Sequence, residues 1–474
     1  MRSRQLLTAL FGAVSAACQR DPVVATHPGA AAQAARTATT TPPNVVVIVL
    51  DDARGDMMTR QFLPLMWARI ADSGTVFTRG YANSPLCCPS RSTLLTGLFQ
   101  HNHGVFGNAF WNHGGARMFR DQTTLATALA GAGYVTGLVG KYLNEYDRLT
   151  PWPYIPPGWG EWRGFSREEY YNYRMVERPW SGGAAVENAY GSTPSEYSTS
   201  VVARRAVDFI QSVPDTLPIF LLVTPFTPHA PATPAPQDVG SCSSLPKFRP
   251  PSFNEQDVSD QPAFVQALPL GSTSTISKSD SRRRSTCAAL RGADRLIDSV
   301  VTQLALSGRL DNTYIVVTSD HGFQFGEHRL FLRKSSLFEE SVRVLFAVRG
   351  PGISKRIDQS HMVQMADIAP TILEWAGQPQ ALQTNGASWT SILANPLASW
   401  RTEVLFEHLA PSPANERVDG LRDQQWSYHE YGNGDRTLYD MIADPFQTTN
   451  LAMLPQYAST AAALAARLAV LRTQ

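Results

Sequence analysis

The run Asn44–Leu50 has only Val, Ile and Leu side chains after its first position. A strand without a polar face has to be covered on both sides, as in a parallel sheet between two layers of helices. Further apolar runs at residues 134–139, 219–224, 314–318 and 344–348 alternate with segments that have helical periodicity. This alternation predicts a doubly wound α/β domain.

The C-terminal part follows a different pattern. Short strands are predicted at residues 404–406, 426–428 and 437–439, and an Ala/Leu-rich helix ends the chain. We therefore expect a large domain over residues 44–384 and a smaller α+β subdomain over residues 385–474, with a small antiparallel sheet and a helix.

Two long stretches predict no core element. Residues 151–180 are rich in aromatic side chains with Pro and Gly breaks, and we expect a substrate-facing loop there. Residues 237–286 are polar and lack periodicity, as is typical of a functional or mobile insertion. After this insertion, a helix is expected from residue 288 to residue 306.

Acidic and imidazole side chains follow two of the predicted strands. Asp51 and Asp52 come directly after the first strand, and Asp320 and His321 follow the strand at residues 314–318. Open α/β sheets bind ligands at the carboxyl ends of their strands, and carboxylate oxygens suit hard divalent cations. A metal site is therefore predicted at this edge, although Asp pairs also occur in simple turns.

A cysteine lies at a predicted helix start. Pro89 fits the first turn of a helix because its missing N–H would have no intrahelical partner there. The free N–H groups and the helix dipole would favour an anion beside Cys87. The simpler alternative is a buried pair, Cys87 and Cys88, packed as small apolar side chains.

The residues Cys87-Cys88-Pro89-Ser90-Arg91, followed by Leu95-Thr96-Gly97, resemble the signature of the type I sulfatases. In that family the first Cys is oxidised by a maturation enzyme to Cα-formylglycine. Within the family, three segments resemble the N-acetylglucosamine-6-sulfatase and heparan endosulfatase branch: Leu86–Arg91, His101–His103 and Lys141–Tyr146.

The resemblance implies an alkaline-phosphatase-like fold, with a mostly parallel sheet between helices and a smaller C-terminal α+β subdomain. It also implies one Ca²⁺ per chain, held by Asp51, Asp52, Asp320, His321 and the formylglycine at Cys87. Arg91 and His103 would contact the formylglycine. Three cationic side chains would bind the sulfate or protonate the leaving alcohol, namely Lys141, His229 and Lys334. Two further residues, Asn144 and Glu145, would contact the sugar.

The implied reaction is hydrolysis of a sulfate ester by the hydrated aldehyde of residue 87. The expected substrate is a sulfated sugar, namely N-acetylglucosamine-6-sulfate units of a glycosaminoglycan, and Tyr142 and Trp159 would line its pocket. An arylsulfatase and a promiscuous phosphodiester or phosphonate hydrolase of the same superfamily remain alternatives. A non-catalytic glycan-binding protein is a third, although no expected ligand is missing from the sequence.

The N-terminus predicts export. Arg2 and Arg4 precede the apolar residues 6–14 and small residues 15–17, which is typical of a signal peptide covering residues 1–17 and too short to span a membrane. Cys18 directly after it leaves a lipid-anchored lipoprotein as an alternative to plain cleavage. Residues 18–43 are a predicted linker, and the expected location is periplasmic or secreted.

The net charge limits the expected binding partners, and the cysteines suggest one disulfide. With 41 basic and 40 acidic residues, the chain gives no electrostatic reason to expect nucleic acid or a membrane surface. Lipid at Cys18 would be its only contact with a membrane. In an exported protein Cys242 and Cys287 could pair, a question of distance that the sequence leaves open. Cys88 is expected to be a buried free thiol.

Overall fold

A computed structural model describes residues 42–410 and 417–474. The predicted signal peptide, Cys18 and most of the predicted linker lie outside these residues. The large sheet has eleven strands in this part of the chain, as predicted for an α/β domain. They are β1 (Asn44–Leu50), β2 (Thr75–Tyr81), β3 (Val135–Gly140), β4 (Glu161–Arg167), β5 (Arg174–Arg178), β6 (Val186–Ala189), β7 (Ile219–Thr224), β8 (Thr313–Ser319), β11 (Arg343–Arg349), β12 (Arg356–Asp358) and β13 (Val363–Gln364).

The strand order is β12-β2-β11-β8-β1-β7-β3-β4-β5-β6, with β13 also paired to β2. The five strands β8, β1, β7, β3 and β4 are parallel to one another, whereas β11 runs antiparallel between β8 and β2. Val46 of β1, for example, pairs with Ile315 on one side and Leu221 on the other. The predicted mostly parallel sheet is therefore confirmed.

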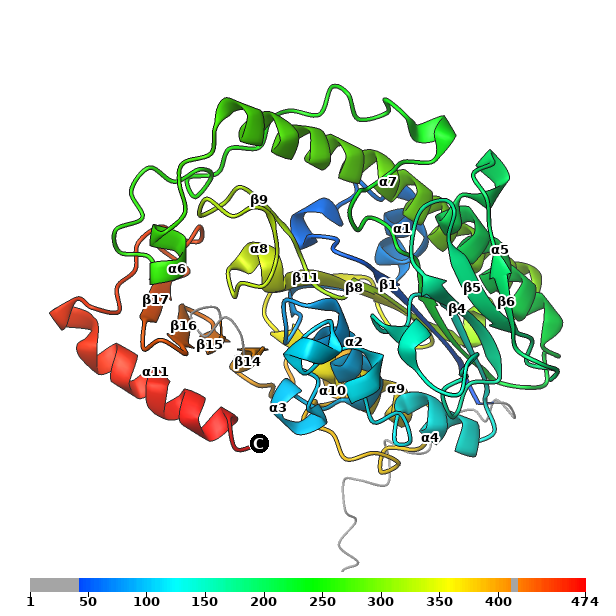
Figure 1. The fold of residues 1–474 in the computed structure, drawn as a ribbon. Coiled ribbons are helices and arrows are strands. Elements are labelled where there is room, and N and C mark those ends of the chain that lie inside the picture. Colours follow the sequence, from blue (N-terminus) through cyan, green and yellow to red (C-terminus); the bar gives the residue numbers. More distant parts are fainter. Residues whose placement is uncertain (1–41, 411–416) are drawn as a thin grey trace, which may run out of the picture. The chain divides into compact units, whose positions relative to one another are not determined.

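The central strand β1 is buried on both faces, as its sequence predicts. Val46, Ile48 and Leu50 pack against α1, α5 and α7, while Val45, Val47 and Val49 belong to the core that contains α2, α4, α9 and α10. Figure 1 shows these helices around the sheet. The helices are α1 (Pro64–Arg69), α2 (Cys87–Thr96), α3 (Gln100–His103), α4 (Leu125–Gly131), α5 (Ser198–Ser212), α6 (Ala263–Gln266), α7 (Thr273–Leu306), α8 (Glu339–Val342), α9 (Ile368–Trp375), α10 (Thr390–Ala394) and α11 (Ala458–Leu471).

The C-terminal residues form the expected antiparallel sheet with a helix packed on it. Leu405, Leu421 and Leu438 of this sheet share a core with Leu464 and Leu468 of α11. By contrast, Trp389 and α10 lie beyond residue 385 but pack in the core of the large sheet. The domain boundary predicted at residue 385 stays a prediction. The strands are β14 (Glu403–His408), β15 (Val418–Asp423), β16 (Trp426–Tyr431) and β17 (Arg436–Asp440); a separate pair consists of β9 (Gln324–Phe325) and β10 (Phe331–Arg333).

Two of the expected irregular stretches are partly regular. Residues 161–178 are not a loop but contain β4 and β5, because Trp162 and Phe165 are fully buried and the strands extend the large sheet. Residues 273–286 are the first part of α7, whose N-cap Ser272 accepts the N–H of Thr275. This part of the helix is largely polar and solvent-facing, which is why its sequence shows no apolar periodicity.

No helix in the described residues is both long and apolar enough to cross a membrane.

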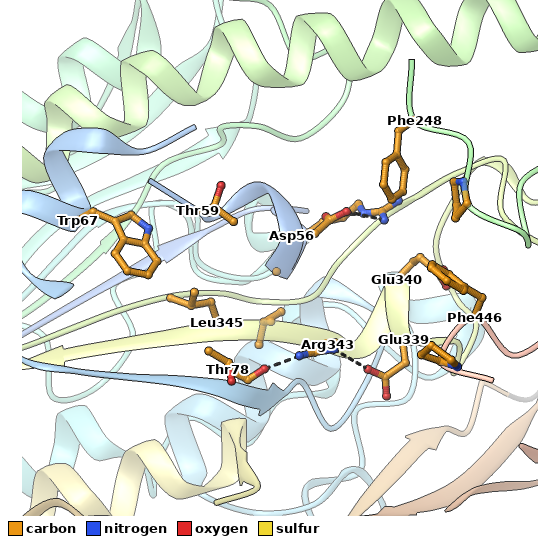
Figure 2. Close-up of a pocket in the computed structure, with 15 residues that line it drawn as sticks. Asp56, Thr59, Trp67, Thr78, Phe248, Glu339, Glu340, Arg343, Leu345 and Phe446 are labelled. Atoms are coloured by element: carbon orange, nitrogen blue, oxygen red, sulfur yellow. Dashed lines mark hydrogen bonds and ion pairs between the residues drawn. The ribbon is translucent and has the colours of Figure 1, made fainter. Parts of the chain in front are cut away.

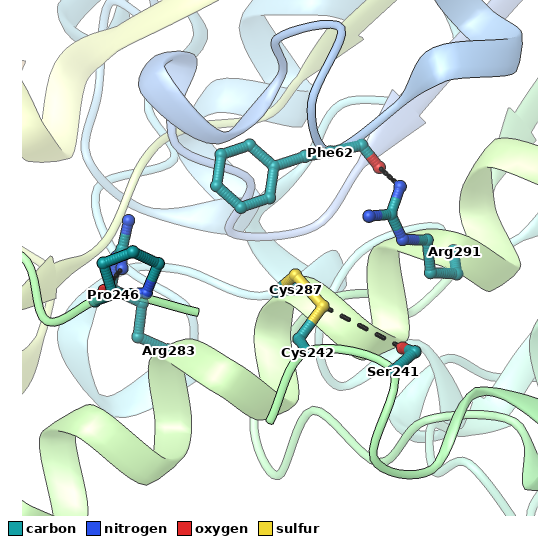
Figure 3. The surroundings of a disulfide bond; sticks show 7 residues. All are labelled: Phe62, Ser241, Cys242, Pro246, Arg283, Cys287 and Arg291. Atoms are coloured by element: carbon teal, nitrogen blue, oxygen red, sulfur yellow. Dashed lines mark hydrogen bonds between the residues drawn. A yellow bond between two sulfur atoms is a disulfide. The ribbon is translucent and has the colours of Figure 1, made fainter. Parts of the chain in front are cut away.

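Cys242 and Cys287 form a disulfide, with their Cα atoms 6.1 Å apart. Figure 3 shows it joining the loop before α6 to α7, close to Phe62 and Arg291. Both cysteines are buried in the core on the α1, α5 and α7 side of the sheet. The bond therefore ties the long insertion to the core of the large domain.

Removal of the disulfide should lower the free energy of unfolding. It closes a loop with a sequence separation of 45 residues, for which chain entropy gives about 4 kcal/mol. The double variant Cys242→Ser/Cys287→Ser should lower the free energy of unfolding by about 2–4 kcal/mol in denaturant titrations. The oxidised and reduced wild-type protein form the matched control, and equal stability of these two forms would contradict the prediction.

Candidate active site

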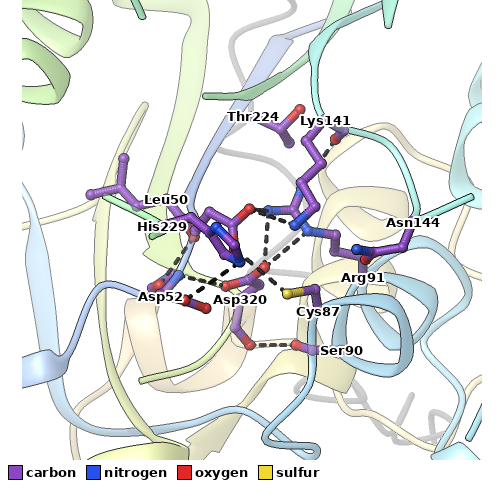
Figure 4. A network of polar contacts seen from close by, with 12 residues as sticks. Leu50, Asp52, Cys87, Ser90, Arg91, Lys141, Asn144, Thr224, His229 and Asp320 are labelled. Carbon is purple, nitrogen blue, oxygen red and sulfur yellow. Dashed lines mark hydrogen bonds and ion pairs between the residues drawn. The ribbon is translucent and has the colours of Figure 1, made fainter. Parts of the chain in front are cut away.

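The carboxyl edge of the parallel strands brings together the residues predicted there. Asp51 and Asp52 follow β1, Asp320 follows β8, Lys141 follows β3 and His229 follows β7. The backbone joins these loops, because Asp51 donates its N–H to Thr227 O and Asp320 donates its N–H to Leu50 O. Figure 4 shows the side chains of Asp52, Lys141, His229 and Asp320 pointing toward one another.

Cys87 lies at the centre of this group. It is the first residue of α2, and its side chain is fully buried. Its Sγ lies 3.2 Å from Lys334 Nζ, 3.3 Å from His321 Nε2 and 3.6 Å from Asp51 Oδ1. The thiol thus contacts both cationic and anionic partners.

Three buried carboxylates are each paired with a cation. Lys141 Nζ lies 2.6 Å from Asp51, Lys334 Nζ lies 2.8 Å from Asp52, and Arg91 Nε donates to Asp320 over 2.9 Å. Burial alone would raise the pKa of Asp51, but Lys141, His229 and Arg91 hold that pKa well below its usual range. Burial would also raise the pKa of Asp52, but the positive charge of Lys334 and the nearby His229 lower it. Asp51 and Asp52 are therefore ionised at neutral pH.

Several side chains of the group around Cys87 could together hold a divalent cation. Ligand atoms of Asp51, Cys87, Asp320 and His321 all lie within 4.8 Å of one another, and so do those of Asp51, Asp52, Cys87 and His229. His321 Nδ1 is 2.8 Å from Gly322 O, an acceptor, so the proton belongs on Nδ1 and Nε2 faces the carboxylates. Such a backbone contact is typical of the second nitrogen of a metal-binding His.

Asp52 is held in a strained conformation. Its φ of 67° lies in the left-handed region, which costs a non-glycine residue about 1–3 kcal/mol. Asp320 Oδ1 accepts the N–H of Asp52, and Ser319 Oγ accepts the N–H of Ala53. These two bonds from the end of β8 fix the loop after β1 and aim the Asp52 carboxylate at Lys334.

His229 stands at the more open side of the group. Its Nε2 lies 3.8 Å from Asp52 Oδ2, and its Nδ1 is 2.9 Å from Ala230 O. Burial lowers the pKa of His229, against the opposing effect of Asp52 and Asp51. The side chain remains 25% exposed, so Nε2 can meet a group that enters from solvent.

The expected contact of His103 with the formylglycine at residue 87 stays a prediction, and in this structure the ring of His103 has other partners. His103 Nδ1 accepts the N–H of Val105, and Nε2 lies 3.1 Å from Thr93 Oγ1. Burial lowers the pKa of His103 to about 3, so the ring is neutral. Both nitrogens are therefore occupied in joining α2 to α3, a distinction that sequence proximity to Cys87 does not reveal.

Cys88 points away from the carboxylates. Its Sγ accepts the N–H of Asn144 over 3.0 Å and lies 3.4 Å from Asn144 Oδ1. Burial raises the pKa of the Cys88 thiol to about 12, as expected for an unreactive buried thiol. Only one of the two adjacent cysteines therefore faces the charged group.

The residues expected to contact sugar differ in their exposure. Asn144 and Glu145 are half-buried, and Glu145 Oε2 accepts the N–H of Phe110 over 2.8 Å. Tyr142 and Trp159 are instead buried in the aromatic core, where Trp159 stacks on Phe220. They cannot form an open pocket wall, and the carboxylate of Glu145 already has a partner within the chain.

Sequence reasoning missed Glu168 and Asn108. Glu168 follows β4, and its carboxylate interacts electrostatically with Lys141 and Asp51; burial raises the pKa of Glu168. Asn108 Oδ1 accepts the N–H of Cys88 over 2.9 Å. The sequence predicts a loop around Glu168, so no predicted strand end points to this residue, and no motif marks Asn108.

A cavity of about 410 Å³ is lined by residues of the loop after β1, of α8 and of β11. Figure 2 shows Asp56, Trp67, Phe248 and Glu340 on its walls, and Arg54, two residues after Asp52, also lines it. It contains none of the side chains that converge on Cys87. The cavity is therefore distinct from the candidate active site, which is the group around Cys87.

Comparison with known proteins gives consistent results. A model of the sulfatase family matches residues 43–378, and a model described as N-sulphoglucosamine sulphohydrolase, C-terminal, matches residues 326–474. The chain is 34% identical to a putative extracellular sulfatase Sulf-1 homolog of Caenorhabditis elegans and 32% identical to N-acetylglucosamine-6-sulfatase of Homo sapiens, over 75% and 72% of its length. It spans only 51% and 62% of these relatives.

Among solved structures, that of BT4656 in complex with its substrate D-glucosamine-2-N,6-O-disulfate superposes with a TM-score of 0.75 at 24% identity, over 91% of this chain and 98% of that one. The fold of this chain therefore belongs to the alkaline-phosphatase-like class of α/β folds, as expected. Within this class, the chain belongs to the sulfatase family, which confirms the resemblance seen in residues 87–97.

Arg91 provides a test of how the site is held together. Its guanidinium is 2.9 Å from Asp320 and 3.6 Å from Asp51, and it also donates to Lys141 O. Arg91→Met should lower the free energy of unfolding by about 3–5 kcal/mol in denaturant titrations, because two buried carboxylates lose a cation. Arg60→Met, which removes an exposed pair with Asp72, is the control and should change stability little. Equal effects would contradict this role of Arg91.

Proposed function

We propose that this protein is a sulfatase that removes the 6-sulfate from N-acetylglucosamine units of a glycosaminoglycan. The observation that carries the proposal is the position of residue 87. Its side chain lies within 3.6 Å of Lys334, His321 and Asp51, at the start of a fully buried helix. Cations, carboxylates and a helix N-terminus therefore all act on one side chain.

Two groups are proposed to complete the site, and the residues fit both. Carboxylates and imidazole nitrogens suit a hard cation, and the structure has two overlapping groups of them that share Asp51 and Cys87. Asp51, Asp52, Asp320 and His321, with the formylglycine at residue 87, would hold Ca²⁺, which would supply a Lewis acid. Oxidation of Cys87 to formylglycine would supply a hydrated aldehyde as the nucleophile. Cys88 is excluded from that role because its thiol faces Asn144.

The remaining side chains act on the sulfate and the leaving alcohol. Lys141 and Lys334 neutralise the charge on the sulfuryl oxygens, since both ammonium groups lie at this edge of the sheet. Asp52 would accept a proton from the hydrated aldehyde at residue 87, and His229 or Lys334 would donate a proton to the oxygen of the leaving alcohol. Arg91 keeps Asp320 and Asp51 in place.

The choice of substrate rests on the relatives and on the loop after β3. Several relatives are named N-acetylglucosamine-6-sulfatase, and Asn144 lies half-buried beside Cys88, from where its amide can reach a substrate bound at residue 87. An arylsulfatase is the alternative, because relatives from algae carry that name. Glu145 would contribute by fixing this loop through Phe110.

Export is proposed as well. The buried Cys242–Cys287 disulfide supports an oxidising compartment, and two relatives are named extracellular sulfatases. The partners would be the sulfated glycan and a formylglycine-generating enzyme. Lipidation at Cys18 remains the alternative to a free periplasmic or secreted protein.

A pair of epimeric substrates tests the substrate assignment. Sulfate release from N-acetylglucosamine-6-sulfate should exceed that from N-acetylgalactosamine-6-sulfate by at least about tenfold in kcat/KM, because a site that hydrogen-bonds one hydroxyl rejects its misplaced epimer. An aryl sulfate serves as the activity control. Turnover of the aryl sulfate with no turnover of either sugar would replace this assignment by that of an arylsulfatase.

The cation assignment predicts a loss of binding. Asp51→Asn and Asp320→Asn should each weaken Ca²⁺ binding in calorimetric titrations by at least about tenfold, because affinity for hard cations depends on the number of charged ligands. Asp56→Asn, which changes a carboxylate outside the cluster, is the control. Unchanged Ca²⁺ affinity in both test variants would contradict the assignment.

A further inference from the structure

The loop between α3 and α4 exposes two large aromatic side chains. Phe110 and Trp111 lie in a short 3₁₀ turn, Phe110–Asn112, and are 47% and 74% exposed. Within the part of the chain that the structure describes, the Trp111 ring has no stacking or hydrogen-bond partner. We call residues 106–120 the aromatic loop; it belongs to the cyan segment of Figure 1.

The aromatic loop is attached directly to the active site. Asn108 Oδ1 accepts the N–H of Cys88, the residue next to the nucleophile. On the other side, Glu145 Oε2 accepts the N–H of Phe110, and Asn144 O accepts the N–H of Ala116. The loop is thus held between the start of α2 and the segment that follows Lys141.

This attachment limits how far the rings can lie from the reaction. Consecutive Cα atoms are 3.8 Å apart, so the Cα of Trp111 is at most about 11 Å from that of Asn108. Asn108 itself touches the residue beside Cys87. A substrate of several sugar units bound at residue 87 is long enough to reach the aromatic loop.

The loop also carries cations without acidic partners. Arg117 and Arg120 are exposed, and neither forms an ion pair with any of the described residues. The Arg117 guanidinium lies 4.0 Å from the centre of the Phe110 ring, which fixes it beside the aromatic surface. A guanidinium group is a good partner for planar, bidentate recognition of oxyanions.

We propose that Phe110, Trp111 and Arg117 bind sulfated sugar units beyond the one whose sulfate is removed. The apolar face of a sugar ring would stack on Trp111, and a sulfate group of the same chain would pair with Arg117. This inference rests on the proposed function and extends it, because it makes a sulfated oligosaccharide a better substrate than a monosaccharide. Arg117 and Arg120 favour this ligand over an apolar protein partner.

Substrates of different length test this surface in the full chain. Trp111→Ala and Arg117→Gln should each lower kcat/KM on a heparin-derived octasaccharide by about tenfold, as truncation of an anchoring side chain typically does. Neither variant should change kcat/KM on 4-nitrophenyl sulfate, which does not extend to the loop. Leu397→Ala and Arg436→Gln are matched exposed controls and should change nothing. Equal losses on both substrates, or no loss on the octasaccharide, would overturn the proposal.

A binding measurement separates this inference from the proposed function. In the inactive Cys87→Ala background, calorimetry with the octasaccharide should show about tenfold weaker binding for Trp111→Ala. Failure of the substrate assignment would appear as no sulfate release from N-acetylglucosamine-6-sulfate, with this difference in binding retained. Equal octasaccharide affinity with and without Trp111 would overturn the glycan surface, even in an enzyme that hydrolyses the monosaccharide.

Discussion

The site depends on a balance of buried charge. Asp51, Asp52 and Asp320 are almost completely removed from solvent, and isolated carboxylates in such a position would be protonated. Arg91, Lys141 and Lys334 supply three positive charges that pair with these carboxylates, and cations hold the pKa values of Asp51 and Asp52 below their usual range. Lys141 pairs with Asp51, Lys334 pairs with Asp52, and Arg91 pairs with Asp320 and also lies 3.6 Å from Asp51, so removal of a cation takes a partner from buried negative charge. The position of Cys87 follows from this arrangement, since Lys334 contacts both its thiol and Asp52.

The parallel sheet makes this balance possible. β1 and β8 are neighbours in register, with Leu50 paired to Ser319, so the residues that follow them lie side by side. Hydrogen bonds between the two loops, from Asp52 N–H to Asp320 and from Ala53 N–H to Ser319, hold Asp52 in its left-handed conformation. The fully buried helix α2 then brings its N-terminus against these loops through Ser90, whose hydroxyl donates to Asp320 O.

The sequence predicted the parts that follow from local patterns. The apolar run before Asp51 predicts a buried strand, and the rule for strand ends predicts that Asp51 and Asp320 meet. Contacts between distant loops could not be predicted in this way. His103 is close to Cys87 in sequence, yet its ring is occupied by Thr93 and Val105, and Trp159 belongs to the core because β4 extends the sheet. The solvent-facing start of α7 lacks the apolar repeat that reveals a helix.

Residue 87 is the most direct point at which to test this account. Peptide mass spectrometry of the mature protein, made together with a formylglycine-generating enzyme, would identify which cysteine is converted. The account predicts an aldehyde at residue 87 and an intact thiol at residue 88, because only the side chain of residue 87 meets Lys334, His321 and Asp51. An aldehyde at residue 88, or a fully active protein with an unmodified Cys87, would contradict it.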